Sequence, residues 1–367
     1  MHTLITGSEG FVGKNLTQKI TEQDSITFST FDRSNSIQDL KEMIPSVDYI
    51  IHLAGSNRPK DEMDFNIDNF ELTKIICDAV ETSGKNIPII FSSSIHAESK
   101  TPYGRSKKAA EQCLLEYAER SGNEVHIFRI PNIFGKWCKP NYNSVVATFC
   151  YNIVNNIPIE IHDKSKILSL VYIDDVIEKI ISSLMDNKNY IEPNIEPIYK
   201  ISLGELSEIL HSFKKNRETL LIDNVGTGLK RALYATYISY LDPPKFSYEL
   251  QSHTDERGIF AEFLKTIESG QFSFFTAHPN VTRGGHYHHT KNEKFLVVSG
   301  SATFKFKNIL TNEKYTIDVS SDSLEVVETI PGWVHDITNT GKSELLVLLW
   351  ANEVFDPSNP DTFMGEV

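Results

Sequence analysis

Three histidines and a glutamate stand close together in the stretch GGHYHHTKNEKFLVVSG, residues 284–300. Side chains alternate along a β-strand, so His286 and His288 would face one way while Tyr287 faces the other. Glu293 follows after a short turn, and the later stretch IPGWVHDITN adds His335 on a second predicted strand. Three imidazoles and a carboxylate suit zinc or another borderline divalent ion. A histidine cluster on an exposed loop is the alternative interpretation of His-x-His alone.

A second chemical pattern opens the chain, in the stretch MHTLITGSEGFVG. Gly7, Gly10 and Gly13 fall between a predicted strand and a predicted helix, where the missing Cβ atoms let a pyrophosphate approach the helix N-terminus. The second strand ends in FSTFDRS, which places Asp32 where a carboxylate would accept a ribose 2′-hydroxyl and Arg33 where a guanidinium would meet a 2′-phosphate. The pattern predicts dinucleotide binding and favours NADPH, with a solvated acid-base pair as the alternative for the last two residues.

A proton donor is predicted in the stretch TPYGRSKKAAEQCLLEYA, where Tyr103 and Lys107 share one face of a helix. A lysine beside a phenol favours the phenolate, so we expect the pKa of Tyr103 to fall toward neutrality and its hydroxyl to exchange a proton with a substrate oxygen. The preceding stretch IIFSSSIH ends in hydroxyls that could bind the same oxygen, Ser94 first and Ser93 in reserve. Alternatively, the serines only cap the strand end.

Two kinds of element must position these residues. Through about residue 240, short β-branched runs such as TLIT, DYIIHLAG, PIIFSSS and VHIFRI alternate with segments of helical period, which predicts βαβ units and a parallel sheet. After the prolines of YLDPPKFS, short alternating strands such as SATFKFKN and YTIDVS indicate an all-β domain. We therefore predict a dinucleotide-binding domain over residues 1–243 and a metal-binding domain over residues 244–367.

Length and charge restrict the function classes. A chain of 367 residues is long enough for two buried cores. Its 36 basic and 49 acidic side chains give a net charge of -13, which argues against nucleic-acid binding and leaves no basic stripe for a membrane surface. The opening has no basic segment followed by an apolar one, and no apolar run approaches the roughly 20 residues of a membrane helix. These features predict a cytoplasmic protein.

Read in order, TGSEGFVG, IIHLAG, FSSS, YGRSK and RIPNIFG resemble the extended short-chain dehydrogenase/reductase family over about residues 1–240. The resemblance implies a Rossmann-type doubly wound α/β sheet and a catalytic set of Ser94, Tyr103 and Lys107. Asn132 looks like a contact to a nucleotide-sugar substrate, or else it ties down a loop. Together with Tyr103 and Lys107, the residues implied in cofactor binding are Gly7, Gly10, Phe11, Val12, Gly13, Asp32, Arg33, Leu53, Ala54 and Gly55.

The C-terminal stretches HYHHTKNEKFLVVSG and PGWVHDITN resemble the two motifs of the cupin superfamily, over about residues 250–367. This implies an all-β jelly-roll barrel that binds one divalent metal ion, expected to be zinc, with His286, His288, Glu293 and His335 as ligands. The stretch TRGGHYHH also resembles the Arg-Gly-x-His segment of metal-independent deoxysugar 3,5-epimerases, in which the histidine is a base. His286 is therefore a ligand, a base or neither, and Arg283 binds a diphosphate or is a surface charge.

The order of the two domains resembles the bifunctional nucleotide-sugar epimerase-reductases of capsular polysaccharide and O-antigen synthesis. The resemblance implies that the cupin epimerises carbon 3 of a UDP-linked 4-keto-6-deoxy-HexNAc. The reductase then reduces carbon 4 with NADPH to UDP-2-acetamido-2,6-dideoxy-L-talose, a precursor of UDP-N-acetyl-L-fucosamine. Three alternatives remain open: a C4 reductase whose cupin only binds substrate or dimerises, a dinucleotide-sensing regulator, and a metal-dependent dioxygenase cupin. A homodimer is expected because such domains commonly offer self-complementary surfaces.

Overall fold

The computed structural model describes residues 1–59, 61–184, 190–191, 195–250, 252–255, 258–261, 264–266, 270–353, 356 and 358–367. The chain forms two compact units. Unit 1 comprises Met1–Val145 and Ile167–Ile201, and unit 2 comprises Val146–Lys166 and Ser202–Val367. The division that the sequence suggests after residue 243 stays a prediction.

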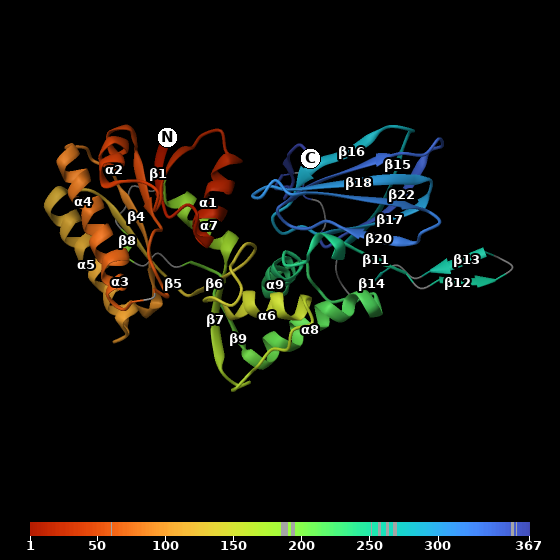
Figure 1. Ribbon diagram of the computed structural model, residues 1–367, viewed down its shortest axis with the longest axis horizontal. Coiled ribbons are helices and arrows are strands. Elements are labelled where there is room, and N and C mark those ends of the chain that lie inside the picture. The colour runs from red at the N-terminus through yellow and green to blue at the C-terminus, as the bar shows by residue number, and fades with distance from the viewer. Residues whose placement is uncertain are drawn as a thin grey trace. The chain divides into compact units, whose positions relative to one another are not determined.

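Unit 1 is built on a parallel sheet in the order β2-β1-β3-β4-β5-β8 (Figure 1). Its strands are β1 (His2–Thr6), β2 (Thr27–Phe31), β3 (Tyr49–His52), β4 (Ile89–Ser94), β5 (Val125–Ile130) and β8 (Tyr190–Ile191). A second sheet holds β6 (Asn132–Phe134), β7 (Ile167–Tyr172) and β9 (Tyr199–Ser202). Because parallel strands end at one edge, the loops after β1, β3 and β4 meet there. The predicted Rossmann-type sheet is confirmed.

Helices cover both faces of this sheet. They are α1 (Phe11–Thr21), α2 (Ile37–Met43), α3 (Met63–Phe65), the π-helical η2 (Asn66–Glu71), α4 (Leu72–Ser83), α5 (Pro102–Ser121) and α7 (Ile173–Ser183), with the 3-10 turns η1 (Ile44–Ser46) and η3 (Ile95–Glu98). Helices α2, α4 and α5 lie on one face, and α1 and α7 lie on the other (Figure 1). The first group buries Leu40, Ile76 and Leu114 against Leu4 and Phe91 of the strands, which fixes α5 on the sheet.

A buried histidine joins the strands at this edge. His52, at the end of β3, contacts Thr6 of β1 through Nδ1 at 2.7 Å and Thr73 of α4 through Nε2 at 2.9 Å. The Thr73 hydroxyl donates to the carbonyl of Asn69, so Nε2 carries the ring proton and Nδ1 accepts one from Thr6. Burial, with the ammonium of Lys107, lowers the pKa of His52 from 6.5 to about 3. The ring is therefore neutral near pH 7.

Unit 2 contains two antiparallel sheets of five strands, the expected cupin jelly roll. One has the order β11 (Ser247–Glu249), β20 (Glu325–Glu328), β17 (Glu293–Ser299), β22 (Leu345–Ala351) and β15 (Gln271–Ala277). The other has the order β19 (Lys314–Ser320), β18 (Ser301–Asn308), β21 (Trp333–Asn339), β16 (Thr282–Tyr287) and β23 (Phe363–Met364). Two small pairs join β10 (Leu221–Ile222) to β14 (Lys265–Thr266) and β12 (Ser252–Asp255) to β13 (Gly258–Ala261).

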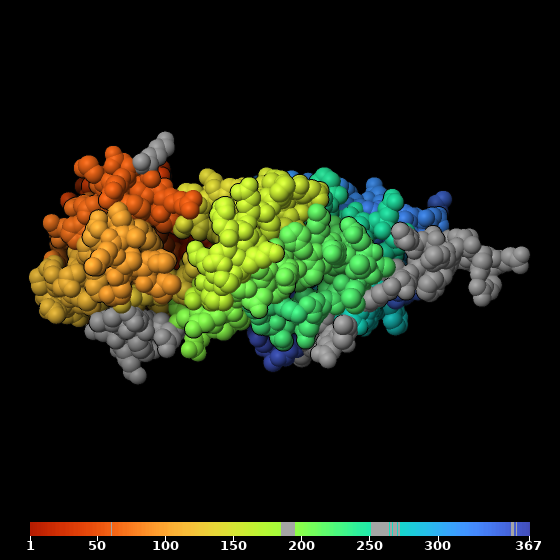
Figure 2. All heavy atoms as spheres, turned by 90° about the horizontal axis from the view of Figure 1, so that it is seen from below, coloured from red at the N-terminus to blue at the C-terminus, as the bar shows by residue number. Residues whose placement is uncertain are grey.

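Three helices belong to unit 2 with the barrel: α6 (Val145–Val154), α8 (Leu203–Thr219) and α9 (Gly228–Ile238). Residues of about 200 to 240 form one continuous green surface in the space-filling view (Figure 2). Helix α8 is tied to the barrel by a buried ion cluster, in which the carboxylate of Glu328 pairs with both Arg217 and Lys294. Lys294 also donates to the hydroxyl of Tyr248 at 3.1 Å. This helix is therefore part of the fold of unit 2.

The proline-rich segment is packed against the barrel. Pro243–Lys245 form a 3-10 turn, and Phe246 beside it is fully buried. The Phe246 ring lies 5.0 Å from that of Trp333 and 5.5 Å from that of Phe306.

The helices of the described residues include none with the length and apolar character of a membrane-spanning segment.

We expect His52 to make unit 1 sensitive to acid. Since its folded pKa is about 3 and its unfolded pKa is near 6.5, the unfolded state binds the proton first as the pH falls. Stability from this residue is complete above pH 6.5 and is lost as the pH falls toward 3. At pH 5 the loss is about 2 kcal/mol. Urea unfolding of wild type and His52→Gln at pH 7 and pH 5 checks this, and an equal pH effect in both proteins would contradict it.

Candidate functional site

The glycine loop brings the backbone of β1 close to that of the segment after β3. Gly7 has φ +73°, and a Cβ there would lie 2.7 Å from the backbone nitrogen of Ala54. A Cβ on Gly13 would lie 2.2 Å from the carbonyl oxygen of Gly7, so neither position accepts a side chain. Gly10 caps α1, and the first-turn N–H groups of Phe11 and Val12 have no partner within the helix. The predicted phosphate site thus has a suitable geometry.

Asp32 and Arg33 follow β2 at the same edge. Asp32 accepts hydrogen bonds from the Ser8 hydroxyl and, at 3.4 Å, from the backbone N–H of Glu9, so it closes the glycine loop from the side. Arg33 is 93% exposed and lies 3.6 Å from Asp68. Such surface pairs are weak, so the guanidinium can turn toward a ligand. On the other side of the loop, Gly55 lies beside Lys107, since a Cβ there would be 3.3 Å from its Nζ.

Ser94, Tyr103 and Lys107 come together at the carboxyl end of β4. The Ser94 hydroxyl lies close enough to Tyr103 to act on the pKa of its phenol, and the Lys107 ammonium donates to the carbonyl of Ser92 at 2.9 Å. Our expectation for the tyrosine was wrong in direction: burial raises the pKa of Tyr103 more than the nearby Ser94 hydroxyl lowers it. Burial also lowers the pKa of Lys107 to about 8, against the effect of Glu111. Tyr103 is therefore a protonated donor near pH 7.

The structure distinguishes the two serines. The Ser93 hydroxyl donates to Glu111 at 2.6 Å, inside a buried pair in which Arg129 binds the same carboxylate at 2.7 Å. Ser94 faces Tyr103, which supports the choice of Ser94. The roles of both residues in a reaction stay predictions.

Asn132, the expected substrate contact, holds two strands together. Its amide donates to the carbonyl of Ser169 at 3.2 Å, which joins β6 to β7. This matches the alternative considered for it, and its substrate role stays a prediction. Asp174, in the first turn of α7, pairs at 2.7 Å with the buried ammonium of Lys136, so this ion pair stabilises the loop after β6.

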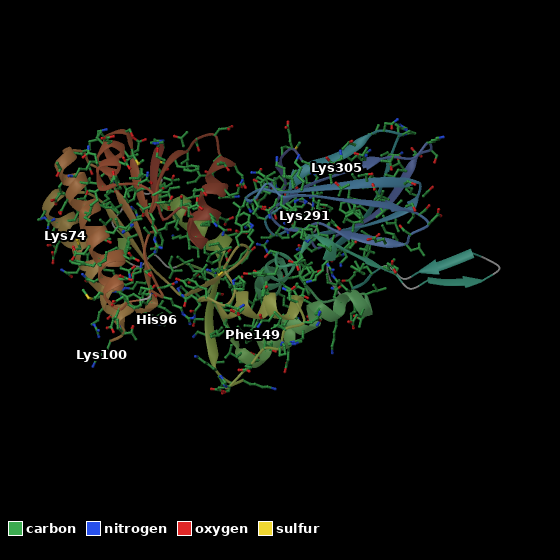
Figure 3. The ribbon with its side chains drawn as sticks, viewed as in Figure 1. Lys74, His96, Lys100, Phe149, Lys291 and Lys305 are labelled. Carbon is green, nitrogen blue, oxygen red and sulfur yellow. The ribbon has the colours of Figure 1, made fainter. Side chains whose placement is uncertain are left out.

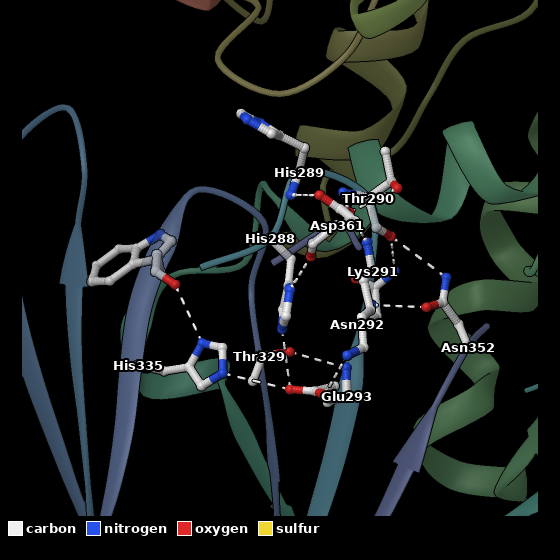
Figure 4. Close-up of polar contacts among 11 residues, drawn as sticks. His288, His289, Thr290, Lys291, Asn292, Glu293, Thr329, His335, Asn352 and Asp361 are labelled. Carbon is white, nitrogen blue, oxygen red and sulfur yellow. Dashed lines mark hydrogen bonds and ion pairs between the residues drawn. The ribbon is translucent and has the colours of Figure 1, made fainter. Parts of the chain in front are cut away.

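In unit 2 the four predicted metal ligands gather at one point of the barrel. His286 lies near the end of β16, His288 just after it, Glu293 begins β17 and His335 lies on β21. One donor atom from each lies within 4.8 Å of the donor atoms of the other three. An oxygen of Glu293 is 3.2 Å from Nε2 of His288 and 3.5 Å from Nε2 of His335 (Figure 4). His286 is the one partly exposed member, which leaves a side open for substrate.

The protonation states of this cluster suit a cation. Nδ1 of His288 donates to the carbonyl of Asp361, and Nδ1 of His335 faces the carbonyl of Trp333 at 3.4 Å, so both Nε2 lone pairs point inward (Figure 4). Burial lowers the pKa of His335, and burial with the neighbouring imidazoles lowers that of His286 to about 4. Burial alone would raise the pKa of Glu293, but the neighbouring His288 and His335 rings hold it well below its usual range. These donors fit a divalent ion such as zinc.

A β-bulge brings Arg283 to the same face as the ligands. Simple alternation along β16 would place Arg283 opposite His286, but the register shifts between Gly284 and His286. Arg283 then pairs with Ile337 and His286 with His335, so both residues lie on the same face of β16, and Arg283 is exposed there. The guanidinium lies 5.4 Å from the ring centroid of Phe275. The sequence signal for this bulge is the Gly-Gly pair, both of positive φ.

Two further residues of the site escaped the sequence analysis. The ammonium of Lys291 lies 3.1 Å from the second oxygen of Glu293, and Asp361 contacts the loop between β16 and β17. Lys291 lies at the end of the barrel where β16 passes into β17, apart from Lys305 on β18 (Figure 3). Lys291 lies within the motif HYHHTKNEKFLVVSG, so its place in the sequence could have indicated a role in the site. Asp361 lies far from the motif, and no sequence pattern indicated its role.

Comparisons with known proteins agree with both halves of this description. Residues 3–196 match the NAD dependent epimerase/dehydratase family, and residues 253–363 match the polysaccharide biosynthesis C-terminal domain. The UDP-2-acetamido-2,6-beta-L-arabino-hexul-4-ose reductase of Pseudomonas aeruginosa is 53% identical over 369 residues, which cover 100% of this chain and 99% of that protein.

Two other relatives cover different shares of the chain. The capsular polysaccharide assembling protein CapF of Staphylococcus aureus superposes with a TM-score of 0.69 at 41% identity, over 100% of both chains. The dTDP-4-dehydro-6-deoxyglucose reductase of Escherichia coli is 27% identical over 59% of this chain and 83% of its own length. The resemblance therefore extends over both units.

We expect unit 2 to bind one divalent ion per chain and Glu293→Gln to weaken that binding at least about tenfold, because the variant loses the anionic ligand. Inductively coupled plasma mass spectrometry of protein equilibrated with zinc measures the stoichiometry. Glu313→Gln, on an exposed turn, is the matched control. Equal zinc content in all three proteins after dialysis against a chelator would contradict the ligand set.

Proposed function

This chain belongs to the NAD dependent epimerase/dehydratase family and carries a polysaccharide biosynthesis C-terminal domain, and from that membership we propose that it is a nucleotide-sugar epimerase-reductase of capsular polysaccharide synthesis. The fusion expected from the motifs is confirmed. The observation that carries the proposal is the coexistence of a Ser94–Tyr103 proton donor in unit 1 and a histidine-glutamate cluster in unit 2. The full-length 53% identity to a UDP-keto-sugar reductase supports the substrate class.

The reductase chemistry follows from the residues around Tyr103. A nicotinamide cofactor, when bound along the glycine loop, supplies hydride to the carbonyl carbon at position 4 of the sugar. Tyr103 is protonated and buried, so it can donate its proton to the carbonyl oxygen as negative charge develops there. Ser94 lies near that hydroxyl and can hold the same substrate oxygen in place. Lys107, anchored by the Ser92 carbonyl, brings positive charge to this edge of the sheet.

NADPH is the preferred cofactor of the proposal. The exposed guanidinium of Arg33 can reach a 2′-phosphate, and its pair with Asp68 is weak enough to exchange. Asp32 already accepts two hydrogen bonds from the glycine loop, so fewer of its lone pairs are available to a ribose hydroxyl.

The epimerase chemistry is assigned to the cluster in unit 2. The proton on carbon 3 is acidic because it is α to the ketone at carbon 4, and its removal needs a base and stabilisation of the enolate oxygen. A divalent ion held by His286, His288, Glu293 and His335 would supply that stabilising charge. His286 is the partly exposed member and is neutral near pH 7, so it can act as ligand or base. Arg283 shares its face and can bind the diphosphate of the substrate.

The full reaction proposed is epimerisation of carbon 3 of a UDP-linked 4-keto-6-deoxy-HexNAc, followed by reduction of carbon 4 to UDP-2-acetamido-2,6-dideoxy-L-talose. The relative from Pseudomonas aeruginosa supports the second half, since its name describes a hexul-4-ose reductase. The second candidate is a reductase alone, in which unit 2 binds substrate or a second subunit. The homodimer expected from the sequence also stays a prediction.

Tyr103→Phe tests the reductase half. We expect NADPH oxidation on the 4-keto substrate to fall at least about 100-fold, because the general acid is lost, while exchange at carbon 3 persists. Absorbance at 340 nm follows the reduction. Tyr49→Phe, at the amino end of β3 and away from the catalytic edge, is the matched control. Unchanged reduction in Tyr103→Phe would overturn the role of this residue.

Deuterium exchange tests the epimerase half. In deuterated buffer without NADPH, we expect wild type to remove the carbon 3 proton signal of the substrate, and His335→Ala to slow this at least about 100-fold because the cluster loses a ligand. Proton nuclear magnetic resonance measures the signal. His211→Ala, on the exposed face of α8, should exchange like wild type. If wild type reduces the ketone but never exchanges carbon 3, the reductase-only candidate is the better one.

A further inference from the structure

The residue Asp361 binds the loop that carries the metal ligands. Its carboxylate accepts backbone hydrogen bonds from His289 at 2.9 Å, Thr290 at 2.6 Å and Lys291 at 2.7 Å. It also accepts the Thr290 hydroxyl at 3.0 Å (Figure 4). Three consecutive backbone N–H groups directed at one carboxylate form an anion-binding nest, and the anion bound in it is the Asp361 side chain. The loop between His288 and Glu293 is thereby held in one conformation.

The backbone of Asp361 orients a ligand as well. Its carbonyl oxygen accepts the Nδ1 proton of His288, which leaves the Nε2 atom of that ring directed at Glu293. Because the other ring nitrogen is fixed in this way, both the tautomer and the rotation of His288 depend on where Asp361 lies.

The segment after Asp361 is fixed to the strand that carries the ligands. Phe363 and Met364 form β23 and pair with Tyr287 and His286 of β16. The N–H of Gly365 donates to the carbonyl of Gly285 at 2.9 Å. The Phe363 ring packs 5.6 Å from the Tyr287 ring, on the side of the strand away from the histidine ligands. Asp361 therefore cannot move without disturbing β16.

The loop is held from its other side by two asparagines. The backbone N–H of Asn292 donates to the side chain of Asn352 at 2.9 Å, and Asn292 donates to the carbonyl of Thr290 at 2.8 Å. Lys291 sits between these anchors, and its ammonium reaches Glu293 at 3.1 Å. The remaining oxygen of Glu293 faces His288 and His335, so the loop conformation decides which oxygen of the ligand faces the cluster.

We propose that Asp361 is a positioning residue of the metal centre, which holds the 289–291 amides and the His288 ring so that His288 and Glu293 converge on one ion. The inference rests on the proposed metal site and adds to it a residue outside both cupin motifs. A carboxylate is required because both of its oxygens accept, whereas an asparagine would direct an N–H group at the nest. Outer groups of this kind commonly contribute ten- to a hundredfold to metal affinity.

The test compares Asp361→Asn with Asp356→Asn in the full chain. Asp356 is a matched control because it is exposed and binds only the turn at Ser358 among the described contacts. Competition with a chromogenic chelator measures zinc affinity. We expect Asp361→Asn to bind zinc about 10- to 100-fold more weakly than wild type, and Asp356→Asn to bind like wild type. Equal affinity of Asp361→Asn and wild type overturns the inference, whereas failure of wild type to bind zinc overturns the metal site itself.

Amide hydrogen exchange of the metal-free protein gives a second readout, which needs neither metal nor activity. The amides of residues 289–291 should be protected in wild type and should exchange about tenfold faster in Asp361→Asn, because hydrogen bonds to a charged group are lost. Circular dichroism establishes whether the variant folds. If it does not fold, wild type alone decides: unprotected amides at 289–291 contradict the proposed nest.

Discussion

A carboxylate removed from water must find positive charge or hydrogen-bond donors within the protein, because leaving it unpaired costs several kcal/mol. Unit 2 meets this requirement at two buried residues. Glu328 is compensated by Lys294 and Arg217, and this pairing joins α8 to the barrel. At Glu293, Lys291 compensates one oxygen, and the other oxygen faces the Nε2 atoms of His288 and His335. Much of the arrangement of unit 2 is set by the placement of these partners.

The same requirement explains where the ligand cluster lies. Glu293 begins β17, in one sheet, whereas His286 and His335 form a cross-strand pair on β16 and β21 of the other. The cluster therefore lies where the two sheets face each other, beside Phe295 and Phe306, whose ring centroids each lie 6.4 Å from that of His335. These apolar rings exclude water from the buried part of the cluster, which strengthens the electrostatic interactions there. A buried carboxylate among three imidazoles favours a divalent ion.

The sequence was sufficient for elements whose signal is local. Periodicity and glycine spacing predicted the strands that became β1, β3, β4 and β5 and the helix α5, and the alternation around His286 and His288 predicted their common face. It failed where tertiary contacts decide. The pKa of Tyr103 depends on burial that no spacing of residues reveals, and the common face of Arg283 and His286 depends on a bulge that breaks the alternation. The contact of Asp361 with residues 289–291 joins positions about seventy apart in the chain, beyond the reach of any motif.

The two centres differ in a way that orders the proposed reactions. The centre in unit 1 offers the neutral hydroxyl of Tyr103, with the ammonium of Lys107 at the same edge of the sheet, which suits protonation of a ketone oxygen during reduction. The cluster in unit 2 suits stabilisation of an enolate. Reduction converts the ketone at carbon 4 into an alcohol, after which the proton on carbon 3 is no longer acidic. In the proposed function epimerisation must therefore precede reduction, and the hydride transfer makes the new configuration permanent.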